Sequence, residues 1–553
     1  MMWTRRNGSG AYVAARRGGV NSFYLLLIGG CASLAVLGWL LWSMGRSIPS
    51  ADQTRGDLMI YCAAGQRLVV EKIAADYKRQ YGVDIRIQPG GSQSLLAQIE
   101  ISKTGDLFLS ADDKFTDLAR QKGLIEETIP VATQKPVIAV LRGNPKNIKA
   151  IQDLLREDVK TALGNPDQAA IGDLTRTLMR KAGIWDALER RVTDSGVFQA
   201  TVNEAANSVK LKASDAAIVW DNTLYQYPDL EAVPTPELDG GLAHVTLAVL
   251  KSSQQPTSAL RFARYLTAAD RGLLIFKKHG FDVVEGDAWA EAPEIVFFCG
   301  SVNRRAVEPI IDAFQKREGV RVITSYDGCG TLTGKMRGLI KDGSPGFPDT
   351  YMACDVYYLQ NVADLFQEAV NVSDTDIVIA VAKGNPLNIR SLQDLTKPNV
   401  RLAVGQAEKC TIGALTQKML QAEKLSRHVQ DNVVTETISS AALVPAVVSG
   451  SADAALAYST DTMAEADKID TIRIDLPSSK AVQPFSIARS SRHKELSRRL
   501  YQTVTRSKKD FQAAGFHWRL DEPVKIAPAK TQAGAQGTQA AEDSPSQKRD
   551  SQP

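Results

Sequence analysis

Short apolar runs alternate with longer amphipathic stretches along most of the chain. One such run, IVFFC (295–299), precedes a stretch, 304–317, whose apolar residues recur at helical spacing and share one face. That face carries Ala306, Ile310, Ile311 and Phe314. The alternation then continues with a strand-like 320–326, a helix-like 332–340, and strand-like 349–355 and 377–383. This order predicts an α/β fold with mostly parallel sheets, in which ligands bind beyond the carboxyl ends of the strands.

The alternating pattern occurs twice. The stretch DLMIYCAAGQRLVVEKIAADYKRQYGVDI (57–85) is echoed by EIVFFCGSVNRRAVEPIIDAFQKREGVRV (294–322), and 237 positions separate Cys62 from Cys299. Later matches lie 238 to 241 positions apart, so the register drifts by only a few residues. A repeat of this length indicates duplication of a whole domain rather than a short-period solenoid. We therefore expect domain 1 at 57–285 and domain 2 at 294–518, joined by a linker, 286–293.

The N-terminal region contains an apolar segment. Residues 23–44 are 22 consecutive residues without a charge, enough to span a hydrocarbon core of about 30 Å as a helix. Four arginines precede it, so the positive-inside rule places residues 1–22 in the cytoplasm and a linker, 45–56, outside. A cleaved signal peptide is the alternative, because IGGC (28–31) resembles a weak lipoprotein cleavage site. The apolar run continues for 13 residues beyond Cys31, which favours an uncleaved transmembrane helix.

Composition narrows the class of protein further. The 66 basic and 62 acidic residues nearly balance, and no basic stripe stands out, so we expect no nucleic-acid partner. Residues 519–553 are polar and lack hydrophobic periodicity, which predicts a disordered tail.

Catalytic motifs are missing from the sequence. DGCGTLTGKM (327–336) approaches a phosphate-binding P-loop, but Cys329 replaces its first glycine and Met336 its Ser/Thr. No HExxH or GxSxG occurs, and none of the five histidines is adjacent to a repeated cysteine. Several aspartates near strand ends are expected to cap helices or to hold strand–loop junctions rather than to act as paired acids; these are Asp106, Asp112, Asp113, Asp349 and Asp355. We therefore predict no enzyme and no cofactor.

Four successive segments carry a family resemblance: CAAGQRL, GGSQSLLAQIE, GDLFLSADD and the loop LGNP…AIG. They resemble the bacterial periplasmic molybdate-binding proteins, which are type II solute-binding proteins of ABC importers. The resemblance covers 57–285 and, more weakly, 294–518. It implies two tandem type II periplasmic-binding-protein domains, each with two α/β lobes joined by two crossover strands. In domain 1 the crossovers are expected at 135–143 and 243–252.

The resemblance also implies an oxyanion held between the lobes, largely by hydroxyls and by backbone N–H groups near helix starts. Neither domain keeps the family's full set of contacts. Carried over position by position, the ligand-binding residues are Gly65, Ser92, Ile171, Val202 and Trp220 in domain 1, and Ser301, Cys329, Ile412, Ser440 and Tyr458 in domain 2.

Arginines follow the first strand of each domain: Arg67 in domain 1, and Arg304 and Arg305 in domain 2. A guanidinium there could pair with an anion bidentately. The alternative is that all three are solvated residues of a first helical turn.

Cysteines are concentrated in domain 2. Cys299, Cys329, Cys354 and Cys410 all fall at predicted ligand-side strand ends, whereas domain 1 has only Cys62. Three interpretations stay open: small apolar residues, one or two disulfides favoured by an oxidising exterior, or a thiol-rich site for a soft metal. No C-x₂-C pair is present.

The sequence therefore predicts a single-pass protein of a bacterial inner membrane with both domains in the periplasm. Its expected role is to capture a small oxyanion of molybdate or tungstate type for an ABC permease. The alternatives are a tethered sensor or scaffold with one degenerate domain, and a thiol-rich metal-binding module in domain 2.

Overall fold

The computed structural model describes residues 56–342 and 345–520. The predicted transmembrane helix, the residues before it, all but the last residue of the linker that follows it, and the tail from residue 521 lie outside these ranges. None of the helices in the described part of the chain has the length and apolar character needed to cross a membrane.

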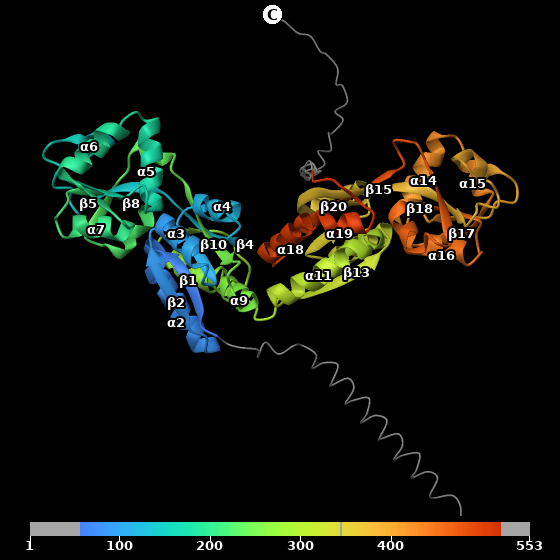
Figure 1. Cartoon of the computed structure of the whole chain (residues 1–553), viewed down its shortest axis with the longest axis horizontal. Coiled ribbons are helices and arrows are strands. Elements are labelled where there is room, and N and C mark those ends of the chain that lie inside the picture. The colour runs from blue at the N-terminus through green and yellow to red at the C-terminus, as the bar shows by residue number, and fades with distance from the viewer. Residues whose placement is uncertain (1–55, 343–344, 521–553) are drawn as a thin grey trace, which may run out of the picture. The chain divides into compact units, whose positions relative to one another are not determined.

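Domain 1 consists of two lobes, each built on one β-sheet (Figure 1). The sheet of lobe 1 has the strand order β11-β4-β10-β3-β1-β2, and that of lobe 2 the order β7-β6-β8-β5-β9. The elements of lobe 1 are β1 (Leu58–Ala63), η1 (Ala64–Gln66, a 3-10 turn), α2 (Arg67–Tyr81), β2 (Ile85–Gly90), α3 (Ser92–Ser102), β3 (Leu107–Ser110), α4 (Asp113–Gln121), β4 (Ile125–Gln134), β10 (Ala243–Leu250), α9 (Pro256–Leu266), α10 (Gly272–Lys278) and β11 (Asp282–Val283). The elements of lobe 2 are β5 (Pro136–Leu141), η2 (Ile151–Leu155), β6 (Thr161–Gly164), α5 (Ala170–Lys181), α6 (Trp185–Ser195), β7 (Val197–Gln199), α7 (Val202–Lys210), β8 (Ala216–Trp220), η3 (Asp221–Gln226), β9 (Leu230–Val233) and α8 (Pro236–Asp239).

Domain 2 repeats this arrangement, with one connected ten-stranded sheet that runs through both lobes. The elements of its lobe 1 are β12 (Glu294–Gly300), η4 (Ser301–Asn303), α11 (Arg304–Glu318), β13 (Arg321–Asp327), α12 (Cys329–Asp342), β14 (Thr350–Met352), α13 (Val356–Gln360), η5 (Ala363–Leu365), the first part of β15 (Phe366–Ala382), β20 (Lys480–Ala488), α18 (Lys494–Arg506), α19 (Lys508–Ala513) and β21 (His517–Trp518). The elements of its lobe 2 are the second part of β15, η6 (Leu392–Thr396), β16 (Leu402–Gly405), α14 (Thr411–Ala422), α15 (Ser426–Gln430), β17 (Val433–Thr437), η7 (Ser440–Ala442), α16 (Leu443–Val448), β18 (Ala454–Tyr458), α17 (Ser459–Thr462), η8 (Met463–Glu465) and β19 (Ile469–Arg473).

The sheets are mixed, so the expectation of mostly parallel sheets was wrong. In lobe 1 of domain 1, β1 pairs in parallel with β2 and β3, but β10 pairs antiparallel with both β3 and β4. The connection between the lobes explains the difference. Strand β4 leaves lobe 1 and β10 returns to it, so the two must run in opposite directions. The spacing of apolar residues predicts strands and helices, but it does not show in which direction a strand re-enters the sheet.

The first crossover differs between the domains. In domain 1, β4 ends at Gln134 and β5 begins at Pro136, which has no backbone N–H to donate to a sheet. The residue at this position in domain 2 is Ile377, whose N–H donates a hydrogen bond to Ser479 O (2.7 Å). The 17-residue β15 therefore runs unbroken from one lobe into the other.

The predicted elements of domain 2 are confirmed, with shifted ends. The amphipathic stretch 304–317 is α11, which buries its apolar face and ends at Gly319 in the left-handed conformation (φ 65°). This position favours glycine because a Cβ there would be strained. Helix α12 begins at Cys329, three residues before the predicted start, so this cysteine lies in the first turn of the helix rather than in a loop.

Candidate functional site

Four helix starts converge on a small cavity between the lobes of domain 1. Turn η1 and helix α3 come from lobe 1, and helices α5 and α7 from lobe 2. The cavity measures about 20 Å³, far less than the roughly 300–1,000 Å³ of pockets for drug-sized ligands. Its wall consists of Ala63, Ala64, Gly65, Gly90, Gly91, Ser92, Ala111, Ala169, Ala170, Ile171, Thr201, Val202 and Trp220.

No charged side chain lines this cavity among the described residues. The first N–H groups of a helix have no partner within the helix, and the helix dipole adds about half a positive charge at that end. The Ser92 hydroxyl accepts a hydrogen bond from Ala111 N (3.1 Å), so its own hydrogen is available to a ligand. The wall therefore offers a small anion neutral donors and helix dipoles.

The structure brings together the five predicted ligand-binding residues of domain 1. Gly65, Ser92, Ile171, Val202 and Trp220 all line the cavity. A Cβ at Gly65 would lie 3.3 Å from Val202 Cγ1 and 3.8 Å from Trp220 Cδ1, so a larger residue would reduce the space. Their role in binding stays a prediction.

The arginines lie outside this wall. Arg67 Nε pairs with Glu71 Oε1 (2.6 Å), and the Arg67 side chain is 57% exposed. Arg304 pairs in the same way with Glu308 (3.1 Å), and Arg305 is exposed. The geometry favours solvated first-turn residues over a role in anion pairing.

The equivalent region of domain 2 is richer in hydroxyl groups. Turn η4 begins at Ser301, which aligns it with Ala64 of η1 rather than with Gly65. The Ser439 hydroxyl donates to Ser301 Oγ (3.0 Å), and Ser440 Oγ lies 3.5 Å from the same oxygen. Since Ser301 is in lobe 1 and Ser439 and Ser440 are in lobe 2, these contacts bridge the cleft.

Three further hydroxyls in this region are buried, and each has no hydrogen-bond partner within the described part of the chain. They belong to Tyr351, Thr411 and Tyr458, which are at most 1% exposed. Their domain 1 counterparts, Phe108, Ala170 and Trp220, carry no hydroxyl. An unsatisfied buried hydroxyl costs free energy, so the Tyr458 hydroxyl is a donor available to a ligand. The hydroxyls of Tyr351 and Thr411 lie near the Cys329 sulfur and lower the pKa of its thiol.

The remaining predicted residues of domain 2 lie in the same region. Cys329 begins α12, Ile412 is in the first turn of α14, and Tyr458 ends β18. All three are buried. Burial raises the pKa of the Tyr458 hydroxyl well above its usual value, and nearby cysteines add to this effect. Tyr458 is therefore a neutral hydrogen-bond donor at physiological pH.

The cysteines are buried, unbonded thiols in the part of the chain that the structure describes. Cys329 Sγ lies 3.1 Å from Cys354 Sγ, whereas Cys410 is in the other lobe with its thiol directed at Thr437 O (3.6 Å). Burial raises the pKa of the thiols of Cys299 and, to about 11, of Cys410.

The structure does not support the predicted metal site of Cys299, Cys329, Cys354 and Cys410. Across residues 56–342 and 345–520, no three His, Cys, Asp or Glu side chains are grouped to hold a metal ion. The fourth thiol, Cys410, belongs to the opposite lobe, and burial disfavours the thiolates of Cys299 and Cys410 that a soft metal needs.

The structure confirms that the aspartates near strand ends are structural. Asp112 caps α4 by accepting a hydrogen bond from Lys114 N (2.9 Å), and Asp355 caps α13 by accepting one from Tyr357 N (2.9 Å). Asp106 and Asp349 each accept a bond from the first strand of their domain. Burial raises the pKa of Asp112 to about 6.

Both clefts are closed by hydrogen bonds between lobes. In domain 1, Gln93 N and Ser94 N donate to Gln168 O (3.2 and 3.3 Å), and in domain 2 Thr331 N donates to Lys409 O (3.1 Å). These bonds join the first turn of α3 or α12 to the loop before α5 or α14. The helix that offers its N-terminus to the cavity is therefore tied to the opposite lobe.

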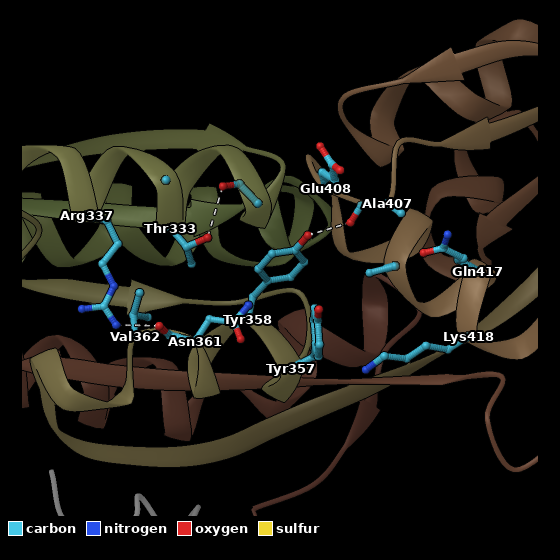
Figure 2. A pocket seen from close by; sticks show the side chains of 13 residues that line it. Thr333, Arg337, Tyr357, Tyr358, Asn361, Val362, Ala407, Glu408, Gln417 and Lys418 are labelled. Carbon is cyan, nitrogen blue, oxygen red and sulfur yellow. Dashed lines mark hydrogen bonds between the residues drawn. The ribbon is translucent and has the colours of Figure 1, made fainter. Parts of the chain in front are cut away.

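Side chains add a different contact to each closed cleft. In domain 1, Lys114 forms an ion pair with Asp173 across the lobes. In domain 2, the Tyr358 hydroxyl donates to Ala407 O (3.0 Å), and Lys418 Nζ lies 3.8 Å from the centre of the Tyr357 ring. Figure 2 shows Tyr358 reaching from α13 to Ala407.

A larger pocket of about 450 Å³ lies beside this contact in domain 2 (Figure 2). It extends from the first turn of α12, at Gly330, to Gln417 and Lys418 of α14. Tyr358 and Ala407 are themselves part of its lining.

Sequence reasoning missed several residues of this region. Thr201 lines the domain 1 cavity and caps α7, where its hydroxyl accepts a bond from Glu204 N (3.2 Å) and the Glu204 carboxylate accepts one from Thr201 N. The spacing of T-x-x-E is a readable capping signal. Nothing in the local pattern marks Tyr351 or Thr411, because only the packed lobes bring them to the cleft.

Comparison with known proteins gives two matches along the chain. The profile described as bacterial extracellular solute-binding protein matches residues 58–282 and again 295–517. The molybdate-binding protein ModA of Mycobacterium tuberculosis is 28% identical over 236 residues, which cover 42% of this chain and 87% of that protein. The ModA protein of Escherichia coli is 26% identical over 266 residues, covering 47% and 97%. Among solved structures, the periplasmic molybdate-binding protein of Azotobacter vinelandii matches at 19% identity with a TM-score of 0.36, covering 41% of this chain and all of that one.

Proposed function

Since the chain belongs to the family of bacterial extracellular solute-binding proteins, we propose that it captures a small tetrahedral oxyanion of molybdate or tungstate type for an ABC permease. The observation that carries the proposal is the domain 1 cavity, which is about 20 Å³ in volume and surrounded by four helix starts. The closed cavity has no room for a sugar or a peptide. Helix N-termini favour negative charge.

The mechanism follows from the two lobes. An oxyanion would enter between open lobes and accept hydrogen bonds from Ser92 at the start of α3 in lobe 1 and from N–H groups at the starts of α5 and α7 in lobe 2. Because donors on both lobes contact the same anion, binding favours the closed state. The permease would then distinguish the closed, loaded domain from the open, empty one.

Neutral donors also account for selectivity. Without a cation in its wall, the cavity would bind a monovalent or a larger anion less tightly. A tetrahedral dianion can accept hydrogen bonds from several directions at once. Ser92 and the N–H groups of Ile171 and Val202 are the proposed donors of domain 1. Ser301, Ser440, Tyr458 and the N–H of Ile412 take this role in domain 2.

The proposed location is the periplasmic face of a bacterial inner membrane, with residues 23–44 as the anchor. The charge-free run and the four arginines that precede it support this placement. Extraction of membranes with alkaline carbonate provides the test. An anchored chain stays in the pellet, whereas release into the supernatant would contradict the anchor.

Binding is tested by calorimetric titration of the full chain with molybdate, tungstate, sulfate and phosphate. Two matched variants separate the clefts: Ala64→Asp places a carboxylate at the start of η1, and Ser301→Asp places one at the equivalent start of η4. Aspartate is favourable at a helix start, so each variant is expected to fold. Its charge would occupy the anion position of one domain and leave the other unchanged.

We expect each variant to lose binding in its own cleft by at least about 100-fold, which corresponds to about 2.7 kcal/mol. Absence of heat with all four anions in the unmodified chain would contradict the proposed function. Heat that neither variant reduces would place the anion elsewhere.

A second candidate, a tethered sensor in which the domains have different tasks, is favoured by the different cleft chemistry of domain 2. There a thiol replaces the Ser92 hydroxyl, and three buried hydroxyls have no counterpart in domain 1. The two block variants also test this candidate. A single binding event lost only in Ala64→Asp would assign capture to domain 1 alone.

A further inference from the structure

One contact in the wall of the domain 1 cleft has both of its partners replaced by cysteine in domain 2. In domain 1, Ala111 N donates to the hydroxyl of Ser92, the first residue of α3. In domain 2, Cys354 N donates to the sulfur of Cys329, the first residue of α12 (3.0 Å). The backbone N–H donates to the equivalent side chain in both domains, but in domain 2 both residues carry a thiol.

The two sulfurs are close enough to bond. Cys329 Sγ lies 3.1 Å from Cys354 Sγ, and a disulfide bond of about 2.05 Å requires them to approach by roughly 1 Å. Both residues belong to lobe 1, so this approach needs no movement between lobes.

A third difference makes room for the pair. A Cβ at Gly300 would lie 2.3 Å from Cys354 Sγ and 2.8 Å from Cys329 Sγ, distances at which atoms overlap. The domain 1 residue at this position is Ala63, which does carry a Cβ. Three positions have therefore changed together, in a manner that accommodates two sulfurs side by side.

Cys329 is the more acidic thiol of the pair. It stands at the N-terminus of the 14-residue α12, where the helix dipole favours a negative charge. Burial raises the pKa of the Cys329 thiol, but hydrogen bonds with Cys354, Thr411 and Tyr351 outweigh burial and lower it. The pKa of Cys354 is raised, first by its hydrogen bond to Cys329 and then by burial. A helix start that attracts oxyanions thus also stabilises a thiolate.

We propose that Cys329 and Cys354 form a reversible disulfide that sets the anion affinity of the domain 2 cleft. The Cys329 thiolate attacks one sulfur of an external disulfide and releases the other as a thiolate, which takes up a proton from solvent, and a mixed disulfide remains on Cys329. The Cys354 thiol loses its proton to solvent and displaces the second external thiol, forming the Cys329–Cys354 bond. Two protein thiols are oxidised and one external disulfide is reduced to two thiols.

The effect on binding rests on the proposed function of the clefts. In the reduced state the Cys329 thiolate places a negative charge at the helix start that would hold the oxyanion. Oxidation removes that charge and leaves the hydroxyls of Ser301, Ser440 and Tyr458 in place. Like charges close together in a buried site repel, so the oxidised cleft is the better anion site.

The other thiols of the described residues serve as internal controls. Cys62, Cys299 and Cys410 are buried, and each directs its thiol toward a backbone carbonyl oxygen at 3.4 to 3.6 Å. The lining of the 450 Å³ pocket includes Gly330, the neighbour of Cys329, so this pocket is the route by which an external disulfide would approach the pair.

The first test maps thiols in the full chain. The protein is reduced, freed of reductant, incubated with oxidised glutathione, and alkylated in denaturant before digestion and mass spectrometry. We expect a peptide in which Cys329 and Cys354 are linked, with Cys62, Cys299 and Cys410 alkylated. Alkylation of Cys329 and Cys354 to the same extent as Cys62, or linkage of Cys329 to another cysteine, would overturn the proposal.

The matched variant is Cys329→Ser with Cys354→Ala, which restores the domain 1 residues at both positions. It is expected to fold, since this pair packs in domain 1, and to show no linked peptide. A titration with 5,5′-dithiobis(2-nitrobenzoate) in denaturant should find two fewer thiols after oxidation of the unmodified chain and no change in the variant.

The second test measures molybdate binding by calorimetry in the Ala64→Asp background, where only the domain 2 cleft is open to the anion. We expect affinity to rise at least about 10-fold on oxidation and to be independent of redox state once Cys329→Ser and Cys354→Ala are added. Equal affinities for the oxidised and reduced forms would overturn the regulatory half of the proposal. A linked peptide without molybdate heat in either state would instead contradict the proposed function.

Discussion

The two clefts of this chain lie in domains of the same fold but differ in the side chains that line them. The domain 1 cleft consists of alanine, glycine and apolar side chains, with Ser92 and Thr201 as its hydroxyl donors. At seven equivalent positions domain 2 carries a hydroxyl or a thiol in place of an apolar group, a tryptophan or a serine: Ser301, Cys329, Tyr351, Cys354, Thr411, Ser440 and Tyr458. The starts of η1, α3 and α5 have equivalents at the same positions in domain 2, whereas the equivalent of the α7 start is the 3-10 turn η7.

This difference separates two contributions to anion binding. The convergence of helix N-termini belongs to the fold and is present in both domains, so it provides a general preference for negative charge. The side chains belong to each domain and decide which anion fits, and whether the thiol at the second helix start competes with it. Duplication has thus left the backbone donors intact and changed the side-chain donors.

The hinges differ as well. Pro136 interrupts the sheet between the lobes of domain 1, whereas Ile377 allows β15 to continue through domain 2. A continuous strand resists bending more than a break does. We expect the lobes of domain 2 to open through a smaller angle than those of domain 1.

The largest predicted effect concerns the glycines at which the lobes touch. A Cβ at Gly91 would lie 2.2 Å from Gln168 O, and one at Gly328 would lie 2.3 Å from Ile438 O, both in the opposite lobe. Gly91→Ala and Gly328→Ala should therefore prevent closure and weaken oxyanion binding in their own cleft by about 100-fold or more. Calorimetry in the background that blocks the other cleft provides the measurement.

Two glycines provide controls for these variants. Gly240 in domain 1 and Gly334 in domain 2 would place a Cβ in open space. Gly240→Ala and Gly334→Ala should bind as the unmodified chain does. Unchanged affinity in Gly91→Ala would show that closure at this contact is not needed for binding.

The next effect is on stability and is specific to domain 2. Burial raises the pKa of Asp461 to about 6 against the lowering effect of a hydrogen bond with Ser440, and its Oδ2 has no partner within the described residues. The equivalent residue of domain 1 is Thr223. Since the folded state binds the proton more tightly than the unfolded state, this group's contribution to stability is present below about pH 4 and is lost as the pH rises through about 6.

Asp461→Asn removes the buried charge. We expect the variant to exceed the unmodified chain in free energy of unfolding by up to about 3 kcal/mol at pH 8, with the difference disappearing near pH 4. Chemical denaturation across that pH range measures it. A difference that does not change with pH would mean that Asp461 is not the titrating group.

A smaller effect is expected from the hydroxyl that joins the lobes of domain 2. Tyr358→Phe removes the bond to Ala407 O and converts the residue to the one domain 1 has at this position, Phe115. Loss of one hydrogen bond should weaken the closed state by about 0.5–1.5 kcal/mol. Faster amide hydrogen exchange in the first turn of α14, with no change in domain 1, would be the measured result; equal exchange would contradict a role in closure.

The smallest effect belongs to the ion pair of domain 1. Lys114→Gln removes the contact with Asp173, and because the Lys114 side chain is 52% exposed the loss should be about 0.2–1 kcal/mol. Added salt should reduce the difference between variant and parent, since it screens the pair. Domain 2, where Tyr357 takes this position, should show no such salt dependence; a difference that persists in high salt would exclude an electrostatic cause.

The sequence by itself determined the fold class and the duplication of the domain. Periodicity and the 237-residue offset gave the α/β class and the duplication, because burial of one face per element leaves a readable pattern. The family resemblance pointed to Ser92, Ile171 and Val202, which lie in the first turns of α3, α5 and α7. The prediction of helix caps is confirmed for Asp112 and Asp355, because a cap acts within a few residues of its own helix. Asp106 and Asp349 instead accept bonds from strands 47 and 53 positions away.

Only the tertiary structure decided the rest. Antiparallel return strands follow from the path between lobes, and no local pattern encodes that path. The sequence placed four cysteines at strand ends but could not separate Cys410, in the other lobe, from the pair Cys329–Cys354 at 3.1 Å. Contacts between residues 25 positions apart in one lobe, or between lobes, depend on how the elements pack, and packing is a property of the whole chain.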